Sequence, residues 1–137
     1  KKTRSKKYPE KIYIDRSDSN YKDSRPILNE SAIKEFLIEK GFSTIRLSEH
    51  HFAEQIRLFY NASYIVGFHG AGFANLVFCR PKTKVLELRF NNIDHIFKNL
   101  SKSMKVRYDS ILGRAKKTVS SSEKDIEISL KELKKKN

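Results

Sequence analysis

The chain has 137 residues and a mass of 16.0 kDa, which fits one domain of ordinary size. Hydrophobic residues make up 38% and charged residues 33%, so the chain can pack a core and is not fully disordered. No apolar run approaches the roughly 18 residues that a membrane-spanning helix needs. Cys79 is the only cysteine, which excludes an intrachain disulfide and a cysteine-based zinc cluster.

The net charge of +13 lies mainly at the two ends of the chain. Residues 1–11 hold six cations and one anion (+5), residues 12–97 eleven and ten (+1), and residues 98–137 twelve and five (+7). A nucleic-acid reader more often builds a basic face into its fold. We therefore expect no specific nucleic-acid partner, and interpret the basic ends as solvated or as weakly attracted to an anionic membrane surface.

The first half of the chain predicts a flexible basic lead-in followed by alternating strands and helices. The predicted segments are the lead-in 1–10, strands 11–15 and 42–47, a polar loop 16–28, and helices 30–40 and 52–61. Asn29 has the side chain of a helix N-cap, and Gly41 stands where a C-terminal cap belongs. The lead-in precedes a single domain that we place over residues 11–137.

The second half continues this alternation and then becomes polar. The predicted segments are strands 63–68 and 83–88, a short helix 73–78, a helix 93–103, short strands 106–108 and 125–128, a mobile loop 112–123, and a basic terminal helix within 129–137. Strand 63–68 is apolar throughout, as a strand covered on both faces should be. Ser129 is the predicted cap of the terminal helix.

The order of these elements predicts an α/β, Rossmann-like parallel sheet with helices on both faces and right-handed crossovers. Ligands of such sheets bind at the carboxyl ends of the strands. Arg16 follows the first predicted strand, residues 69–72 follow the third, and Glu87 lies near the end of the fourth. These groups should therefore meet at one rim of the sheet.

The rim residues have the chemistry that a nucleotide diphosphate needs. Gly70 and Gly72 let the backbone approach a phosphate closely, and the first N–H groups of the following helix would point at it. Arg16 can pair bidentately with phosphate oxygens, and Glu87 can accept hydrogen bonds from ribose hydroxyls.

Each feature also has a plain structural interpretation. A Gly–x–Gly turn is common as a tight connection, and an isolated His69 is more often a hydrogen-bonded structural histidine. Asn75 stands where the last glycine of the dinucleotide fingerprint would be. Four scattered histidines and one cysteine give no metal-ligand spacing, so we expect neither a metal nor another cofactor.

One ordered set of motifs nevertheless resembles a known family, glycosyltransferase family 61. The set is Asp15-Arg16, Arg25, Asn29-Glu30, Glu54-Gln55, His69-Gly70-Ala71-Gly72, Asn75 and Glu87. The resemblance covers about residues 11–88. Asp15 replaces the serine that is frequent in the family, Phe73 replaces the usual leucine, and nothing beyond residue 88 carries a transferred site.

The resemblance implies the C-terminal, donor-binding half of a GT-B glycosyltransferase. Such an enzyme transfers a sugar from a nucleotide-sugar to a hydroxyl with inversion and without a bound metal. It implies that Arg16 and the turn His69, Gly70, Ala71 and Gly72 stabilise the departing diphosphate. Arg25 and Asn75 would assist, and Glu87 would bind ribose or the donor sugar. His69 is the only candidate general base in this chain.

The resemblance also implies partners. The donor would be a nucleotide-sugar, with UDP-sugars favoured, and the acceptor a hydroxyl of a glycan, a lipid-linked intermediate or a protein. We expect an N-terminal half-domain to be required, so that this chain alone is inactive. Twenty lysines against nine arginines suggest an AT-rich bacterial source, and hence capsular or other surface polysaccharide synthesis in the cytoplasm or at the inner membrane. The alternative is a non-catalytic nucleotide- or polyanion-binding interaction domain.

Overall fold

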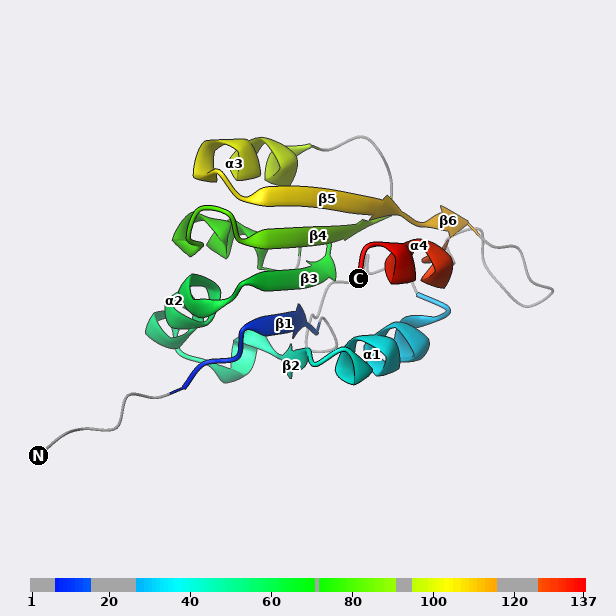
Figure 1. Ribbon diagram of the computed structural model, residues 1–137, viewed down its shortest axis with the longest axis horizontal. Helices are drawn as coiled ribbons and strands as arrows, with labels where there is room; N and C mark the ends of the chain where they lie inside the picture. The colour runs from blue at the N-terminus through cyan, green and yellow to red at the C-terminus, as the bar shows by residue number, and fades with distance from the viewer. Residues whose placement is uncertain (1–6, 16–26, 71, 91–94, 116–125) are drawn as a thin grey trace, which may run out of the picture.

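The computed structural model describes residues 7–15, 27–70, 72–90, 95–115 and 126–137. Its centre is a sheet of five strands in the order β2-β1-β3-β4-β5, in which every neighbouring pair is parallel (Figure 1). The strands are β1 (Lys11–Ile14), β2 (Ser43–Ile45), β3 (Tyr64–Phe68), β4 (Lys84–Arg89) and β5 (Arg107–Leu112). The predicted Rossmann-like parallel sheet is therefore confirmed.

Helical segments cover both faces of this sheet. They are α1 (Glu30–Glu39), α2 (Phe52–Asn61), α3 (Ile96–Met104), α4 (Leu130–Lys135) and the 3₁₀ helices η1 (Leu47–Glu49) and η2 (Phe73–Phe78). Leu37 of α1 and Leu133 of α4 pack in one buried cluster, whereas Phe59 of α2 and Leu76 of η2 pack in another. Successive strand residues point to opposite faces, so β1, β3, β4 and β5 each supply both clusters, whereas β2 supplies only the second, through Ile45.

The two predicted caps of α1 have different outcomes. Gly41 adopts a φ of +90°, and the Gly41 and Phe42 N–H groups donate to the carbonyls of Ile38 and Leu37, each at 3.0 Å. This is the Schellman arrangement, so the C-terminal cap is confirmed. The N-cap prediction is wrong, because the Asn29 side chain makes no cap hydrogen bond. It exchanges two hydrogen bonds with the backbone of Ile128 instead, which joins α1 to the distant C-terminal segment.

Several element boundaries also differ from the predictions. The strand predicted over 42–47 is only three residues long, because the chain turns into η1 at Leu47. The strand predicted over 106–108 extends to Leu112, because it pairs with the whole of β4 and buries Ile111. Beyond it, β6 (Arg114–Ala115) pairs antiparallel with β7 (Ile126–Glu127), so the structure has strand where the loop 112–123 was predicted to begin. The rest of that loop, and the predicted helix start at 93–94, lie outside the described residues.

Both ends of the described chain are attached to the sheet domain. Tyr8 donates to a carboxylate oxygen of Glu54 at 3.3 Å, so the described part of the lead-in contacts α2. At the other end the Ser129 hydroxyl accepts a hydrogen bond from the Glu132 N–H at 3.2 Å, which confirms the predicted cap of α4. Among the described residues, no helix is long and apolar enough to cross a membrane.

Cys79 should be chemically inert in the folded chain. Its side chain is 5% exposed, and burial raises the pKa of the thiol to about 12. At pH 8 only roughly one thiol in ten thousand would then be ionised, and the thiolate is the reactive form. We expect a thiol-specific reagent to modify the native chain far more slowly than the chain in concentrated urea. Equal rates in the two conditions, measured by mass spectrometry, would contradict this packing.

Candidate functional site

The strand order places the topological switch point of the sheet, where a crevice is expected, between the ends of β1 and β3. In a sheet ordered 2-1-3-4-5 the connections leave β1 and β3 in opposite directions, and ligands bind at this switch point. Asp15 follows β1 and is buried, with its carboxylate 2.7 Å from Lys34 Nζ and 3.7 Å from Arg46 Nε. Asp15 therefore holds basic side chains at the crevice.

Three of the predicted site residues cannot be placed. Arg16, Arg25 and Ala71 lie outside the described residues. The other five are His69, Gly70, Gly72, Asn75 and Glu87, and they come together at the ends of β3 and β4.

The turn after β3 has the tight backbone that its glycines predict. Gly70 and Gly72 adopt φ angles of +91° and +74°, and the Gly72 N–H donates to the Gly70 carbonyl at 2.6 Å. A Cβ atom on Gly72 would lie 2.1 Å from Leu47 Cδ1, so a side chain here would also require the Leu47 side chain to move. The predicted short helix is a 3₁₀ segment of six residues, which has little aligned dipole. The side chain of His69 is therefore better placed than the helix start to hold an anion.

His69 is fixed by a buried carboxylate. Its ring nitrogen Nδ1 lies 2.5 Å from Oε2 of Glu87. Its backbone N–H donates a hydrogen bond to the Leu88 carbonyl at 2.8 Å. The side chain of His69 is 26% exposed, whereas that of Glu87 is fully buried. This contact between Nδ1 and a carboxylate orients the ring, so that Nε2 points away from Glu87.

The carboxylate of Glu87 is buried and bound by protein groups. We predicted that it accepts hydrogen bonds from the ribose or the donor sugar, but its carboxylate is closed off from solvent. Its second oxygen, Oε1, accepts hydrogen bonds from Arg89 Nη1 at 3.1 Å and from the Tyr108 hydroxyl. Protein groups thus bind both oxygens, and Glu87 is a positioning residue for His69.

Both donors to Oε1 keep their protons over the working range of pH. Burial raises the pKa of Tyr108 to about 12, and its hydrogen bond to Glu87 acts in the same direction. Burial alone would lower the pKa of Arg89, but hydrogen bonding to Tyr108 and attraction to Glu87 outweigh it, so the net shift is upward. The buried carboxylate is therefore balanced by a permanent cation, which such a charge requires.

Aromatic rings and amides hold the rest of the turn. The His69 ring meets Phe97 of α3 edge-on at a centroid distance of 5.2 Å, and Phe97 also packs on Phe73 at 5.5 Å. The Asn75 amide donates to Gln55 Oε1 at 3.0 Å, and Gln55 donates in turn to the backbone that precedes α2. Asn75 thus ties the turn to the neighbouring loop.

The sequence analysis missed Arg89 and Tyr108. Arg89 could have been found, because Glu87 and Arg89 stand two apart on one strand and so share a face. Two charged groups on a covered face indicate a buried ion pair. Tyr108 could not have been found from the sequence, since its hydrogen bond to Glu87 depends on the pairing of β4 with β5.

The profile of the Glycosyltransferase 61 family matches residues 1–86, which is more than half of the chain. The chain belongs to the glycosyltransferase 61 family. A search of curated proteins gives no match. The matched region of this family 61 chain runs from before β1 to the middle of β4, and therefore contains the whole turn from His69 to Gly72.

No metal centre is evident in the described part of this family 61 chain. Within the ranges that the structure covers, no group of three or more His, Cys, Asp or Glu side chains could hold a metal ion. The charged groups at the crevice are paired with one another instead.

Removing the Tyr108 hydroxyl should destabilise the family 61 fold. Tyr108→Phe deletes one donor to a buried carboxylate, and such a loss costs about 1–3 kcal/mol in the free energy of unfolding. Urea denaturation at pH 7 would measure it. Tyr60→Phe is the matched control, because Tyr60 is exposed and its ring contact with Arg80 does not need the hydroxyl. Equal stabilities of the two variants would refute the role given to Tyr108.

Proposed function

We propose that this chain is the donor-binding half of an inverting glycosyltransferase that uses a nucleotide-sugar. The observation that carries the proposal is the placement of His69: it stands at the switch point of the sheet, oriented by a buried carboxylate, in a chain of the glycosyltransferase 61 family. A histidine fixed in this way supports a role in ligand chemistry better than a role in packing, because its ring is partly exposed at the crevice.

In this proposal the Nε2 side of His69 faces the diphosphate of the donor. When sugar transfer breaks the bond between the anomeric carbon and the phosphate oxygen, negative charge develops on the leaving group. In this proposal His69 donates a hydrogen bond from Nε2 to that group, and Arg16 and Arg25 add positive charge from the chain after β1. Backbone at Gly70, Ala71 and Gly72 allows close approach of the phosphates, with Asn75 holding the turn.

The acceptor hydroxyl attacks the anomeric carbon from the opposite side and must lose its proton to a base. We place that base on a missing N-terminal half-domain, with His69 as the only candidate within this chain. The proposed donor is a UDP-sugar, and the acceptor is a glycan, lipid-linked or protein hydroxyl. The basic chain ends suit contact with an anionic membrane surface, and thus surface polysaccharide synthesis in the cytoplasm of a bacterium.

The first test is a calorimetric titration with UDP, GDP and CDP at two salt concentrations. We expect saturable binding of one diphosphate, weakened about ten-fold or more by His69→Ala, because a charge-assisted hydrogen bond is worth roughly 1.5–3 kcal/mol. His69→Gln, which keeps an N–H near the position of Nε2, should retain part of the affinity.

Lys82→Ala is the control for unspecific attraction. Lys82 lies in the turn before β4, at the amino end of that strand and thus opposite the proposed site, and removing it changes the net charge without altering that site. If the basic ends instead make this a polyanion-binding domain, binding will fall steeply with salt and His69→Ala will behave like wild type. That result would contradict the proposed donor site.

The chain alone should not transfer sugar. Since half of the proposed active site is missing, we expect bound UDP-sugar to give neither transfer nor hydrolysis above the buffer rate, as followed by release of UDP. Addition of an N-terminal half-domain is the condition under which turnover should appear. Steady turnover by the isolated chain, abolished by His69→Ala, would show that the base lies in this chain.

A further inference from the structure

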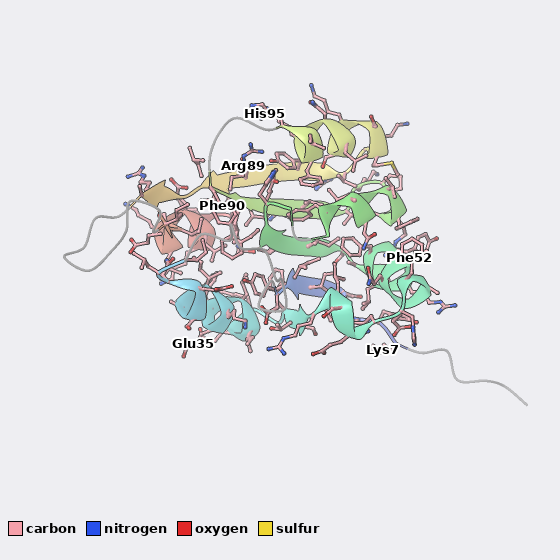
Figure 2. All side chains as sticks on the ribbon, turned by 180° about the vertical axis from the view of Figure 1, so that it is seen from behind. Lys7, Glu35, Phe52, Arg89, Phe90 and His95 are labelled. Atoms are coloured by element: carbon pink, nitrogen blue, oxygen red, sulfur yellow. The ribbon has the colours of Figure 1, made fainter. Side chains whose placement is uncertain are left out.

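A second polar cavity lies on the far side of Glu87 from His69. It has a volume of about 240 Å³ and is enclosed by the end of β4, the middle of β5 and the start of α3. Its lining residues are Arg89, His95, Lys98, Tyr108, Asp109 and Ser110. Figure 2 shows Arg89 and His95 near one another, beside the start of this helix.

The carboxylate of Glu87 links His69 to two residues that line this cavity. Its Oε2 binds His69, whereas its Oε1 binds Arg89 and Tyr108, which both line the cavity. One buried charge therefore orients the groups of two neighbouring sites. A ligand that reaches across this point would be held by both.

The cavity has an excess of positive charge. Arg89 is 4% exposed and its charge is balanced by Glu87. Lys98 is exposed, and it forms no ion pair with any residue that the structure describes. Among the described lining residues the one acid is Asp109, which binds Lys136 at 2.5 Å, and alternation along β5 directs its side chain to the opposite face from Tyr108. The cavity thus favours an anion.

The cavity is also suited to a ligand with hydroxyl groups. Tyr108 and Ser110 supply hydroxyls, which both donate and accept hydrogen bonds, beside the cations of Arg89 and Lys98. A volume of about 240 Å³ is below the roughly 300–1,000 Å³ of pockets for drug-sized ligands, so the occupant is one small unit and not a whole nucleotide.

We propose that this cavity binds the anionic group of an acidic sugar, as a carboxylate or a phosphate on the sugar ring. The proposal rests on the proposed function, because the sugar would belong to the donor or acceptor of that reaction. Arg89 and Lys98 bind the oxyanion, and His95 stands at the mouth as a third donor. The substrate class of the enzyme would then include a uronic acid or a phosphorylated sugar.

The test is a nuclear magnetic resonance titration of the full chain with glucuronate, glucose 6-phosphate, inorganic phosphate and glucose. We expect one of the two acidic sugars to bind about ten-fold or more tightly than glucose, with shifts at Lys98 and Ser110, since charge-assisted hydrogen bonds add roughly 1.5–3 kcal/mol. The stronger of the two identifies the anionic group as a carboxylate or a phosphate.

Matched variants locate the binding. Lys98→Gln should remove most of the preference for the acidic sugar, whereas Lys102→Gln, one turn further along α3 and outside the cavity lining, should keep it. The proposal is wrong if glucose binds as well as either acid, if inorganic phosphate binds as tightly as both, or if the two lysine variants behave alike.

A parallel titration with UDP separates this inference from the proposed function. Binding of UDP without binding of either acid would overturn the acidic-sugar site alone. Binding of an acid without UDP would leave the cavity as proposed and count against the donor site. If UDP displaces the acid competitively, the cavity belongs to the nucleotide and the inference fails.

Discussion

The structure of the site depends on one fully buried carboxylate, that of Glu87. A charge removed from water is costly unless donors surround it, and here three side chains, two from the ends of β3 and β4 and one from β5, meet that need. His69 follows β3, Arg89 closes β4, and Tyr108 stands on β5. The same bonds that stabilise the charge therefore fix the relative positions of these strands and the direction of the His69 ring.

This arrangement explains why a partly exposed histidine can be rigid in a turn built from glycines. The glycines give the backbone its sharp path, but they add no side-chain packing to hold it. His69 is instead held by the contact of its Nδ1 with the Glu87 carboxylate and by the edge-on contact of its ring with Phe97. The position of His69 is thus fixed by neighbouring groups of the protein, which is how a preorganised site is usually supported.

Much of the fold follows from local patterns. Alternating apolar segments predict the parallel sheet, and the buried run Tyr64–Phe68 predicts its central strand. The turn after that strand can also be predicted to lie at the ligand-binding side of the sheet, because ligands of parallel sheets bind at the carboxyl ends of the strands. What local patterns cannot give is pairing at a distance: the bond of Asn29 to Ile128 replaces the expected cap, and the pairing of β5 with β4 brings Tyr108 to Glu87.

The role of Glu87 shows the same limit in chemical terms. A glutamate near the end of a strand, facing a nucleotide crevice, fits direct binding of ribose equally well from the sequence alone. Only the burial of its side chain and the occupation of both its oxygens decide between binding and positioning. Position along the chain could not separate these roles, because they differ in solvent exposure and not in residue type.

The extent of the family match has a structural consequence. The profile ends at residue 86, whereas the carboxylate, the guanidinium and the phenol that orient His69 follow at positions 87, 89 and 108. A chain ending at the match would keep the turn but lose β5, α3 and the partners of the histidine. It would also expose the apolar face that Ile111 and Leu133 cover. The smallest unit able to hold His69 in place therefore extends well past the matched region, at least through β5.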